Sequence, residues 1–187
     1  VCSSDLLSEA GEKVNQFRQS YVDLLQPKFT ALATELGQLN AMSLDYYCGW
    51  PAETNLRAAL LDNLAKDRML GYAQYGAQRA DLNYLHNGCA VKDQLSQGQS
   101  KLATYALRLA QASVLNANST RKVIYLLDDM PSELDPAKQT QILKLCQQMS
   151  NQVFMTAIEL PDLIFSGQEQ VYNLAEGQVR DTPVLAG

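Results

Sequence analysis

The feature that most limits the possible folds is a short, nearly continuous apolar run, Lys122–Leu127, set between two helix-like segments. Apolar residues recur every three to four positions in the flanking segments, Leu102–Leu115 and Pro136–Met149, which is the period of an amphipathic helix. An apolar run of this length without alternation is typical of a strand buried on both faces, and Gln152–Ile158 has the same character. Because helices and strands alternate here, we predict an α/β layer in the second half of the chain.

The first half of the chain opens with a long helical pattern. Apolar residues lie three or four positions apart from Leu7 to about Leu39, which predicts an amphipathic helix with an almost heptad-like seam. Pro27 is expected to kink or restart this helix, and the seam needs a partner helix to bury it. The other expected elements are short: strands at Met42–Tyr47, Gly71–Tyr75, Arg79–Leu85 and Val171–Leu174, a helix at Glu53–Leu70, and a hairpin turn at Asn87–Gly88.

Composition argues against several classes of protein. The chain has 187 residues, of which 47% are hydrophobic, enough for one large domain with a real core. No apolar run approaches the ~18–20 residues that cross a bilayer, so we expect no membrane-spanning segment. The net charge of −5 argues against a polybasic nucleic-acid binder, although it leaves room for a local basic face. Four separated cysteines and a lone His86 predict neither disulfides nor a zinc site, and a reducing cytosol fits this pattern.

The start of the chain is unusual, because it begins with Val1 and not with Met. The hexapeptide at residues 1–6 matches the in-frame translation of a sequencing-adapter sequence. A processed protein would explain the missing Met, and a non-native scar at residues 1–6 is a second hypothesis. In either case we expect the chain to be a fragment of a longer protein.

The segment Leu95–Gln99, with the sequence LSQGQ, comes directly before an apolar helix. Gly98 lets the backbone approach an anion, Ser96 can donate a hydrogen bond, and the helix dipole favours negative charge at this end. These residues therefore form a candidate phosphate seat. An ordinary helix N-cap made by Ser96 is the alternative, and the pentapeptide alone does not decide between them.

An acid pair, Asp128 and Asp129, ends the apolar run at Leu127. Neighbouring carboxylates repel each other, and a magnesium ion on nucleotide phosphates would stabilise them. One acid would then hold the metal while the other polarises an attacking water. Two solvated turn residues are the competing interpretation. The sequence Ser132–Asp135 follows, and a helix is expected to start at Pro136.

The order of these motifs resembles the signature motif, Walker B strand and D-loop of ABC-type ATPases. Longer stretches are similar to one branch of them, the RecF family: Gly71–Leu82, Leu95–Gln111, Lys122–Asp135 and Gln152–Glu159. The resemblance covers residues 7–180 approximately and corresponds to the C-terminal part of RecF. It implies an α/β fold, the C-terminal lobe of an ABC-type ATPase head, with a helical, coiled-coil-like arm at the N-terminus. The implied division is 1–6 scar, 7–40 arm segment and 41–187 head.

The resemblance also implies roles for individual residues. Asp128 would bind Mg²⁺ through water, and Asp129 would be the catalytic carboxylate. Nucleotide-binding residues acting in trans, on the ATP held by the opposite subunit, would be Ser96, Gly98 and Gln99. Ser132 and Asp135 of the D-loop would line the dimer interface. Two positions depart from the pattern, because Gln78 stands where the family usually has His and Ala157 stands at the switch position.

By the same resemblance the parent protein is a cytoplasmic, DNA-binding ATPase without a membrane segment. It would dimerise on ATP, bind single-stranded and gapped duplex DNA, and act with RecO and RecR to load recombinase during repair, replication and the SOS response. The sequence has no G-x-x-x-x-G-K-[ST] loop, which RecF carries near its N-terminus. The chain alone is therefore expected not to hydrolyse ATP.

Two other interpretations stay open. The chain could be a catalytically silent, ABC-like interaction module, or a fragment of another SMC-type ATPase. An upstream Walker A loop in the parent reading frame would argue against the first, and the length of an upstream coiled coil would test the second. Candidate DNA-contact residues are only scattered cations: Arg68, Arg79, Arg108, Arg121 and Lys122.

Overall fold

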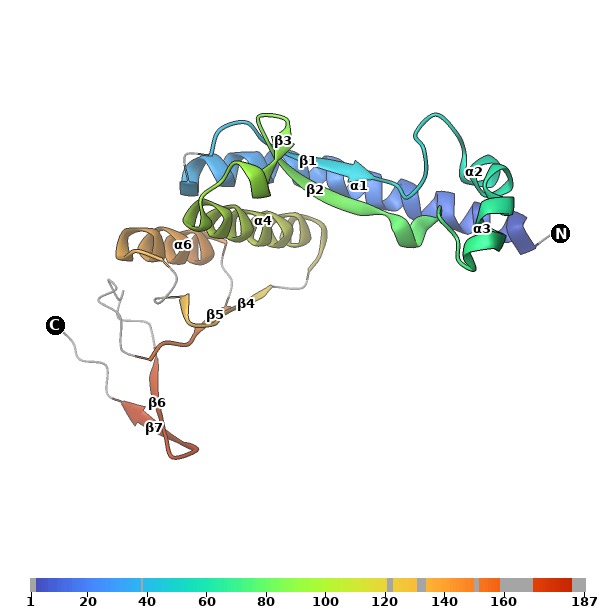
Figure 1. Cartoon of the computed structure of the whole chain (residues 1–187). Coiled ribbons are helices and arrows are strands. Elements are labelled where there is room, and N and C mark those ends of the chain that lie inside the picture. Colours follow the sequence, from blue (N-terminus) through green and yellow to red (C-terminus); the bar gives the residue numbers. More distant parts are fainter. Residues whose placement is uncertain are drawn as a thin grey trace.

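A computed structural model of the chain describes residues 3–37, 39–120, 123–130, 134–149, 152–158 and 170–182. These residues form a long arm joined to a smaller α/β lobe, and the N-terminus lies at the far end of the arm (Figure 1). The arm contains α1 (Ser3–Gly37), β1 (Met42–Tyr47), α2 (Leu56–Asp62), α3 (Leu64–Leu70), η1 (Ala77–Arg79), β2 (Asp81–His86), β3 (Cys89–Ala90) and η2 (Val91–Asp93). The lobe contains α4 (Gln97–Asn118), β4 (Ile124–Leu127), α6 (Pro136–Gln148), β5 (Gln152–Met155), β6 (Val171–Ala175) and β7 (Gln178–Thr182).

Helix α1 confirms the predicted long helix and has 35 residues. It begins at Ser3, four residues before the predicted start, and continues through Pro27, so the proline does not restart it. Its second half is buried through a shared apolar stripe: Val22, Leu25, Phe29, Leu32, Ala33 and Leu36. Helix α4 packs against this half of α1. Leu7, Phe17 and Leu24 of the predicted seam are exposed, so α4 covers only part of it.

The carbonyl groups at the end of α1 are capped by side chains from α6. Lys138 Nζ donates to the carbonyl of Leu36, and Gln141 Nε2 donates to the carbonyl of Glu35 at 2.8 Å. The last carbonyls of a helix have no partner within the helix, so these two bonds satisfy groups that would otherwise need water. They also join the arm to the lobe.

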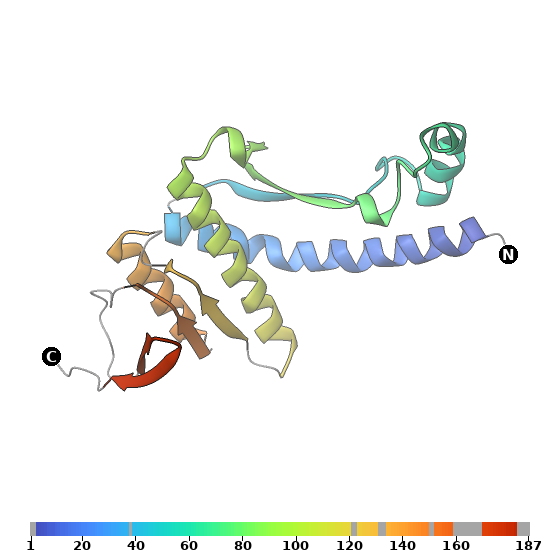
Figure 2. The same cartoon turned by 60° about the horizontal axis from the view of Figure 1, so that its bottom comes forward.

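An antiparallel ribbon of β1 and β2 lies along α1 (Figure 2). Its register runs from Met42 opposite His86 to Tyr47 opposite Asp81. Two side chains of α1 hold it: Gln26 Oε1 accepts from the amide of Leu44 at 2.6 Å, and Thr30 Oγ1 donates to the carbonyl of Met42 at 2.9 Å. The ribbon therefore covers part of the α1 surface for which the sequence pattern predicted a partner helix.

The turn between β2 and β3 confirms the predicted hairpin at Asn87–Gly88. Asn87 and Gly88 have φ of 52° and 78°, the left-handed values that a two-residue turn of this kind requires.

Two expectations for the far end of the arm are wrong. The single helix at Glu53–Leu70 is two helices, α2 and α3, which meet at Asn63. Asn63 is the C-cap of α2 and the N-cap of α3, so its short polar side chain favours a break in the helix there. The strand at Gly71–Tyr75 does not form, because Gly71 has φ 77° and caps α3 in the left-handed conformation.

The lobe has a parallel β4–β5 pair, with α4 and α6 on one face of it (Figure 1). Tyr125 and Leu127 of β4 are buried in the core with these helices, whereas Ile124 and Leu126 are 54% and 76% exposed. The predicted burial of β4 on both faces is therefore wrong for the described residues, since no helix covers the second face. The strands predicted at residues 122–127, 152–158 and 171–174 form at β4, β5 and β6, with shorter bounds for the first two.

The described helices include none that combines the length and apolar character needed to cross a membrane. Among the described cysteines, Cys48, Cys89 and Cys146 carry free thiols. Cys146 is fully buried in the lobe core, and burial raises its pKa to about 12.

We expect Cys89 to react with iodoacetamide at pH 8 while Cys146 stays unmodified in the folded chain. Cys89 is exposed, whereas a pKa of about 12 leaves only ~10⁻⁴ of the Cys146 thiol as the reactive thiolate. Mass spectrometry of peptides after timed alkylation measures both sites. Denaturation in urea is the control and should expose Cys146, and equal rates in the folded chain would contradict its burial.

Candidate functional site

The acid pair lies directly after β4, at the carboxyl end of the parallel strand pair. Strand β5 runs beside β4 in the same direction, with Leu127 opposite Met155. The chain segments that leave the two strands therefore meet, and the amide of Thr156 donates to the carbonyl of Leu127 at 2.9 Å. Carboxyl ends of parallel strands are the usual place for ligands in α/β folds.

The hydroxyl of Thr156 contacts both halves of the acid pair. Its Oγ1 donates to Asp128 Oδ1 at 2.6 Å and accepts from the amide of Asp129 at 3.0 Å. Asp129 has φ 45°, a left-handed conformation that Asp and Asn tolerate better than most residues. One hydroxyl thus fixes the carboxylate of Asp128 and the backbone of Asp129 at once.

Thr156 is a site residue that the sequence pattern did not point to. The sequence signal for Thr156 was indirect. When two strands such as β4 and β5 pair in parallel, the residues that follow them lie side by side. Ala157, the departure noted at the switch position, follows it and is exposed.

The donor set around the acid pair fits a magnesium ion. Asp128 is exposed, and carboxylate and hydroxyl oxygens are the hard ligands that Mg²⁺ prefers. The described residues offer no group of three or more His, Cys, Asp or Glu side chains that could hold a metal. A magnesium ion at Asp128 would also take water molecules as ligands.

The residues at the start of α4 form a capping box. Ser96 Oγ accepts from the amide of Gln99 at 3.2 Å, and Gln99 Oε1 accepts from the amide of Ser96 at 3.0 Å. The structure therefore confirms that Ser96 is the N-cap of α4. A Cβ at Gly98 would meet no atom within 4 Å, so the surface above this exposed helix end is open. The contact of Ser96, Gly98 and Gln99 with phosphate stays a prediction.

The predicted D-loop is described only in part. Asp135 is the N-cap of α6, its Oδ1 accepts from the amide of Lys138 at 3.0 Å, and Pro136 occupies the first turn as expected. Ser132 lies outside the described residues. The dimer-interface role of both residues stays a prediction.

Two of the candidate DNA-contact residues have local partners. Arg79 donates to the carbonyl of Ala73 from Nε and Nη2, at 3.3 and 3.1 Å, and its guanidinium lies 5.4 Å from the centroid of Tyr72. Arg108 donates to Gln111 Oε1 at 3.2 Å. Arg121 and Lys122 lie outside the described residues, so the DNA contacts stay untested.

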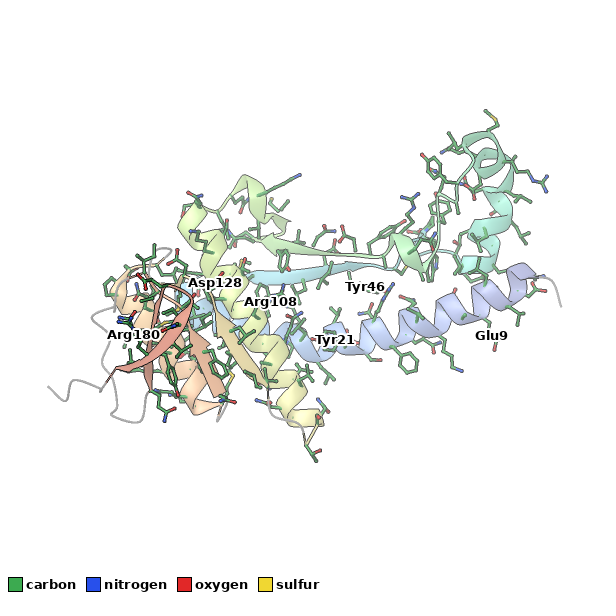
Figure 3. The ribbon with its side chains drawn as sticks, turned by 90° about the horizontal axis from the view of Figure 1, so that it is seen from below. Glu9, Tyr21, Tyr46, Arg108, Asp128 and Arg180 are labelled. Atoms are coloured by element: carbon green, nitrogen blue, oxygen red, sulfur yellow. The ribbon has the colours of Figure 1, made fainter. Side chains whose placement is uncertain are left out.

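The two motifs lie at the same end of the lobe. Strand β4 runs antiparallel to α4, so the end of β4 and the beginning of α4 lie at the same end of the lobe (Figure 2). Asp128 lies at the lobe side of the molecule, far from Glu9 at the tip of α1 (Figure 3). A ligand surface built from both motifs would therefore belong to the lobe and not to the arm.

No family model matches the chain. It is similar to the DNA replication and repair protein RecF of Pseudomonas aeruginosa, with 34% identity over 184 residues, 96% of this chain and 50% of that protein. The RecF of Azotobacter vinelandii is 37% identical over 175 residues, 94% of this chain and 45% of that protein. The chain thus spans about half the length of the curated relatives it matches.

Solved structures with a similar fold include the recombination mediator protein RecF-ATP, with a TM-score of 0.80 and 24% identity. That match covers 96% of this chain and 49% of the solved chain. An SMC head bound to the C-terminal winged-helix domain of ScpA has a TM-score of 0.51 and 16% identity, over 96% of this chain and 48% of the solved chain. The predicted fold class is confirmed as a fold: an α/β lobe with a helical arm segment, shared with the solved RecF and SMC-head structures.

Proposed function

We propose, starting from the homology of this chain to RecF along nearly all of its length, that it is the C-terminal half of a RecF-type DNA-repair ATPase. The observation that carries the proposal is the acid pair at the end of β4, held by the hydroxyl of Thr156 at 2.6 and 3.0 Å. Solvated turn residues would need no such clamp. The fixed carboxylate of Asp128 suits a metal-holding role, and the fixed backbone of Asp129 limits where its own carboxylate can lie, as water activation requires.

In this proposal the two acids have different tasks. Asp129 would accept a proton from the water that attacks the γ-phosphate of ATP. Asp128 would hold Mg²⁺ through a water molecule, and the ion would neutralise phosphate charge. Thr156 keeps Asp128 in place and so acts as a positioning residue.

The start of α4 would act on the nucleotide of a second subunit. Ser96, Gly98 and Gln99 lie at the positive end of a 22-residue helix, which suits a phosphate. The amides of Ser96 and Gln99 donate within the capping box, so a phosphate that used them would have to replace those two bonds. Ser132 and Asp135 would line the same dimer interface. Each site of an ATP-dependent homodimer would then need a Walker A loop from one subunit and this helix end from the other.

The wider biology follows from the same homology. The complete protein would be cytoplasmic, bind single-stranded and gapped duplex DNA, and act with RecO and RecR to load recombinase, including during the SOS response. The 1–6 segment would be a scar and 41–187 the head. We extend the proposed arm beyond 7–40, because the β1–β2 ribbon lies along α1.

A complementation experiment tests the trans arrangement. The protein to use is this chain joined behind a RecF half that carries a Walker A loop, here called the joined protein. One variant carries Ser96→Arg, which blocks the helix end. The other has its Walker A lysine replaced, which blocks the Walker A loop. Each variant alone should therefore be inactive. Mixed in equal amounts, random dimers should recover about a quarter of the ATP hydrolysis, because half of them contain one intact site.

The controls separate the competing interpretations. This chain alone, without a Walker A loop, should show no hydrolysis. No recovery on mixing, with dimers present by light scattering, would contradict the trans site. A joined protein that dimerises and binds DNA without any hydrolysis would instead support the silent interaction module.

We expect Thr156→Val to lower ATP hydrolysis by the joined protein roughly 10–100-fold, whereas Thr156→Ser retains most of it. Valine has the shape of threonine but lacks the hydroxyl that contacts Asp128 and Asp129. Titrating Mg²⁺ adds a measurement that simple destabilisation would not change, and the Thr156→Val protein should need more of the ion. Equal activity of the two variants would show that the hydroxyl has no positioning role.

A further inference from the structure

Helix α6 contacts both the end of the D-loop and the end of the arm helix. It follows the D-loop directly, with Asp135 as its N-cap, and its first turns lie next to the end of α1 (Figure 2). The side chains that make these contacts all come from positions 138–141 of α6. One helix therefore connects a predicted dimer-interface loop to the arm.

The D-loop side of this connection is held by two hydrogen bonds. Asp135 Oδ1 accepts from the amide of Lys138 at 3.0 Å, and Gln139 Nε2 donates to the carbonyl of Leu134 at 2.7 Å. Gln139 is only 4% exposed, and breaking a hydrogen bond of a buried amide group costs free energy. The last two residues of the D-loop, Leu134 and Asp135, are therefore expected to move together with α6.

The arm side of the connection includes a charge. Lys138 Nζ donates to the carbonyl of Leu36, and Gln141 Nε2 donates to the carbonyl of Glu35 at 2.8 Å. The last turn of α1 has no basic residue of its own. The C-terminal end of a helix carries a partial negative charge, so the ammonium group of Lys138 supplies a cation that stabilises this end. Leu36 is fully buried, which limits the screening of this interaction by water.

Lys138 is the residue that both sides share. Its backbone amide donates to Asp135, whereas its side chain reaches the last turn of α1. A displacement of α1 against the lobe would therefore act on a residue that also holds the D-loop. Close-packed helices respond to such displacements as whole units and not by gradual deformation. Lys144, further along α6, is exposed and makes neither contact within the described residues.

We propose that Lys138 couples the arm to the D-loop, so that DNA held against the arm speeds up ATP hydrolysis at the dimer interface. This inference rests on the proposed function and adds a regulatory contact to it. Two candidate DNA-contact residues, Arg68 and Arg79, belong to the arm, whereas the nucleotide motifs belong to the lobe. A signal between them has to cross the junction of α1 with the lobe, where Lys138 lies. Lys138 acts through Asp135, so it is a positioning residue.

Lys138→Met in the joined protein tests the coupling. Methionine keeps an unbranched side chain and a similar helix propensity but cannot donate to the carbonyl of Leu36. Hydrolysis at saturating ATP is measured without DNA and with a saturating gapped duplex, and the ratio of the two rates is the stimulation. The unmodified protein should be stimulated about 5-fold or more, the lower end of typical allosteric effects, and the variant less than about twofold. The rate without DNA and the affinity for the duplex should stay within about threefold.

Matched variants separate coupling from a general effect on the helix. Lys144→Met removes an exposed lysine from α6 and should leave the stimulation unchanged. Lys138→Arg keeps the charge and the N–H donors and should retain most of the stimulation. Loss of stimulation in Lys144→Met, or equal loss in Lys138→Arg and Lys138→Met, would overturn the proposal. So would a Lys138→Met protein that loses its rate without DNA as well, because that result indicates a purely structural role.

A second variant covers the case in which Lys138→Met lowers the melting temperature. Gln141→Met removes only the bond to the carbonyl of Glu35 and should reduce the stimulation in part, and unchanged stimulation would overturn the proposal. The proposed function fails separately, because no hydrolysis by the unmodified joined protein would contradict it and the coupling with it. Hydrolysis that DNA does not change, or full stimulation of Lys138→Met, would overturn the coupling alone.

Discussion

Asp129→Asn is expected to lower DNA-stimulated ATP hydrolysis by the joined protein roughly 10²–10⁴-fold, the range for loss of a general base. Asparagine has nearly the shape of aspartate but cannot accept a proton from the attacking water. It also tolerates the left-handed backbone of residue 129, where φ is 45°, as well as aspartate does. The hydrogen bond from the amide of residue 129 to Thr156 Oγ1 should persist, so the loss reports on charge and not on folding.

Phosphate release measured at saturating ATP and DNA gives the rate, and nucleotide binding is measured separately. The variant should still bind ATP, because none of the proposed phosphate contacts involves Asp129. Asp45→Asn is the matched control, since Asp45 is an exposed acid on β1 in the arm. A hydrolysis rate for Asp129→Asn within about threefold of the control would remove Asp129 from the catalytic role.

Local sequence signals were sufficient where one or two residues determine the structure. Asn87 and Gly88 form the predicted turn because both adopt positive φ at little cost. Helix α6 starts at Pro136, where the proline predicted it, and Asp135 is its N-cap. The acid pair could also be found from sequence, because it directly follows an apolar strand.

Burial could not be predicted in the same way, because it depends on what covers a surface. The apolar residues of β4 suggested a strand covered on both sides, but Leu126 is 76% exposed. The apolar residues of a strand show which of its faces can be buried. They do not show which other element, if any, covers that face. Exposed Ile124 and Phe154 belong to the same strand pair and show the same effect.

Long-range hydrogen bonds were the other feature that sequence patterns missed. Thr156 lies 28 positions after Asp128 and contacts it only because β4 and β5 pair in parallel. The ribbon on α1 depends in the same way on Gln26 and Thr30, which lie 18 and 12 positions before the residues they contact. A single sequence contains these residues but does not show which of them meet.

Phe29→Ala is expected to destabilise the chain by about 3–5 kcal/mol, the range for removal of a fully buried Phe. Phe29 is 0% exposed, lies in the core shared by α1 and α4, and meets the ring of Tyr84 edge-on at a centroid distance of 6.1 Å. Domains have only about 5–15 kcal/mol of stability, so the variant should unfold at much lower urea concentration. Unfolding followed by circular dichroism gives the change in free energy.

Phe17→Ala is the matched control for this prediction, because the same substitution occurs on the same helix. Phe17 is 70% exposed, so its removal should change stability by no more than about 0.5 kcal/mol. The gain in helix propensity from Phe to Ala is similar at both positions and cancels in the comparison. The difference between the two variants therefore measures the packing of the second half of α1 against the lobe. Equal destabilisation by Phe17→Ala and Phe29→Ala would mean that the first half of α1 is buried as well, contrary to the exposure of Phe17 in the structure.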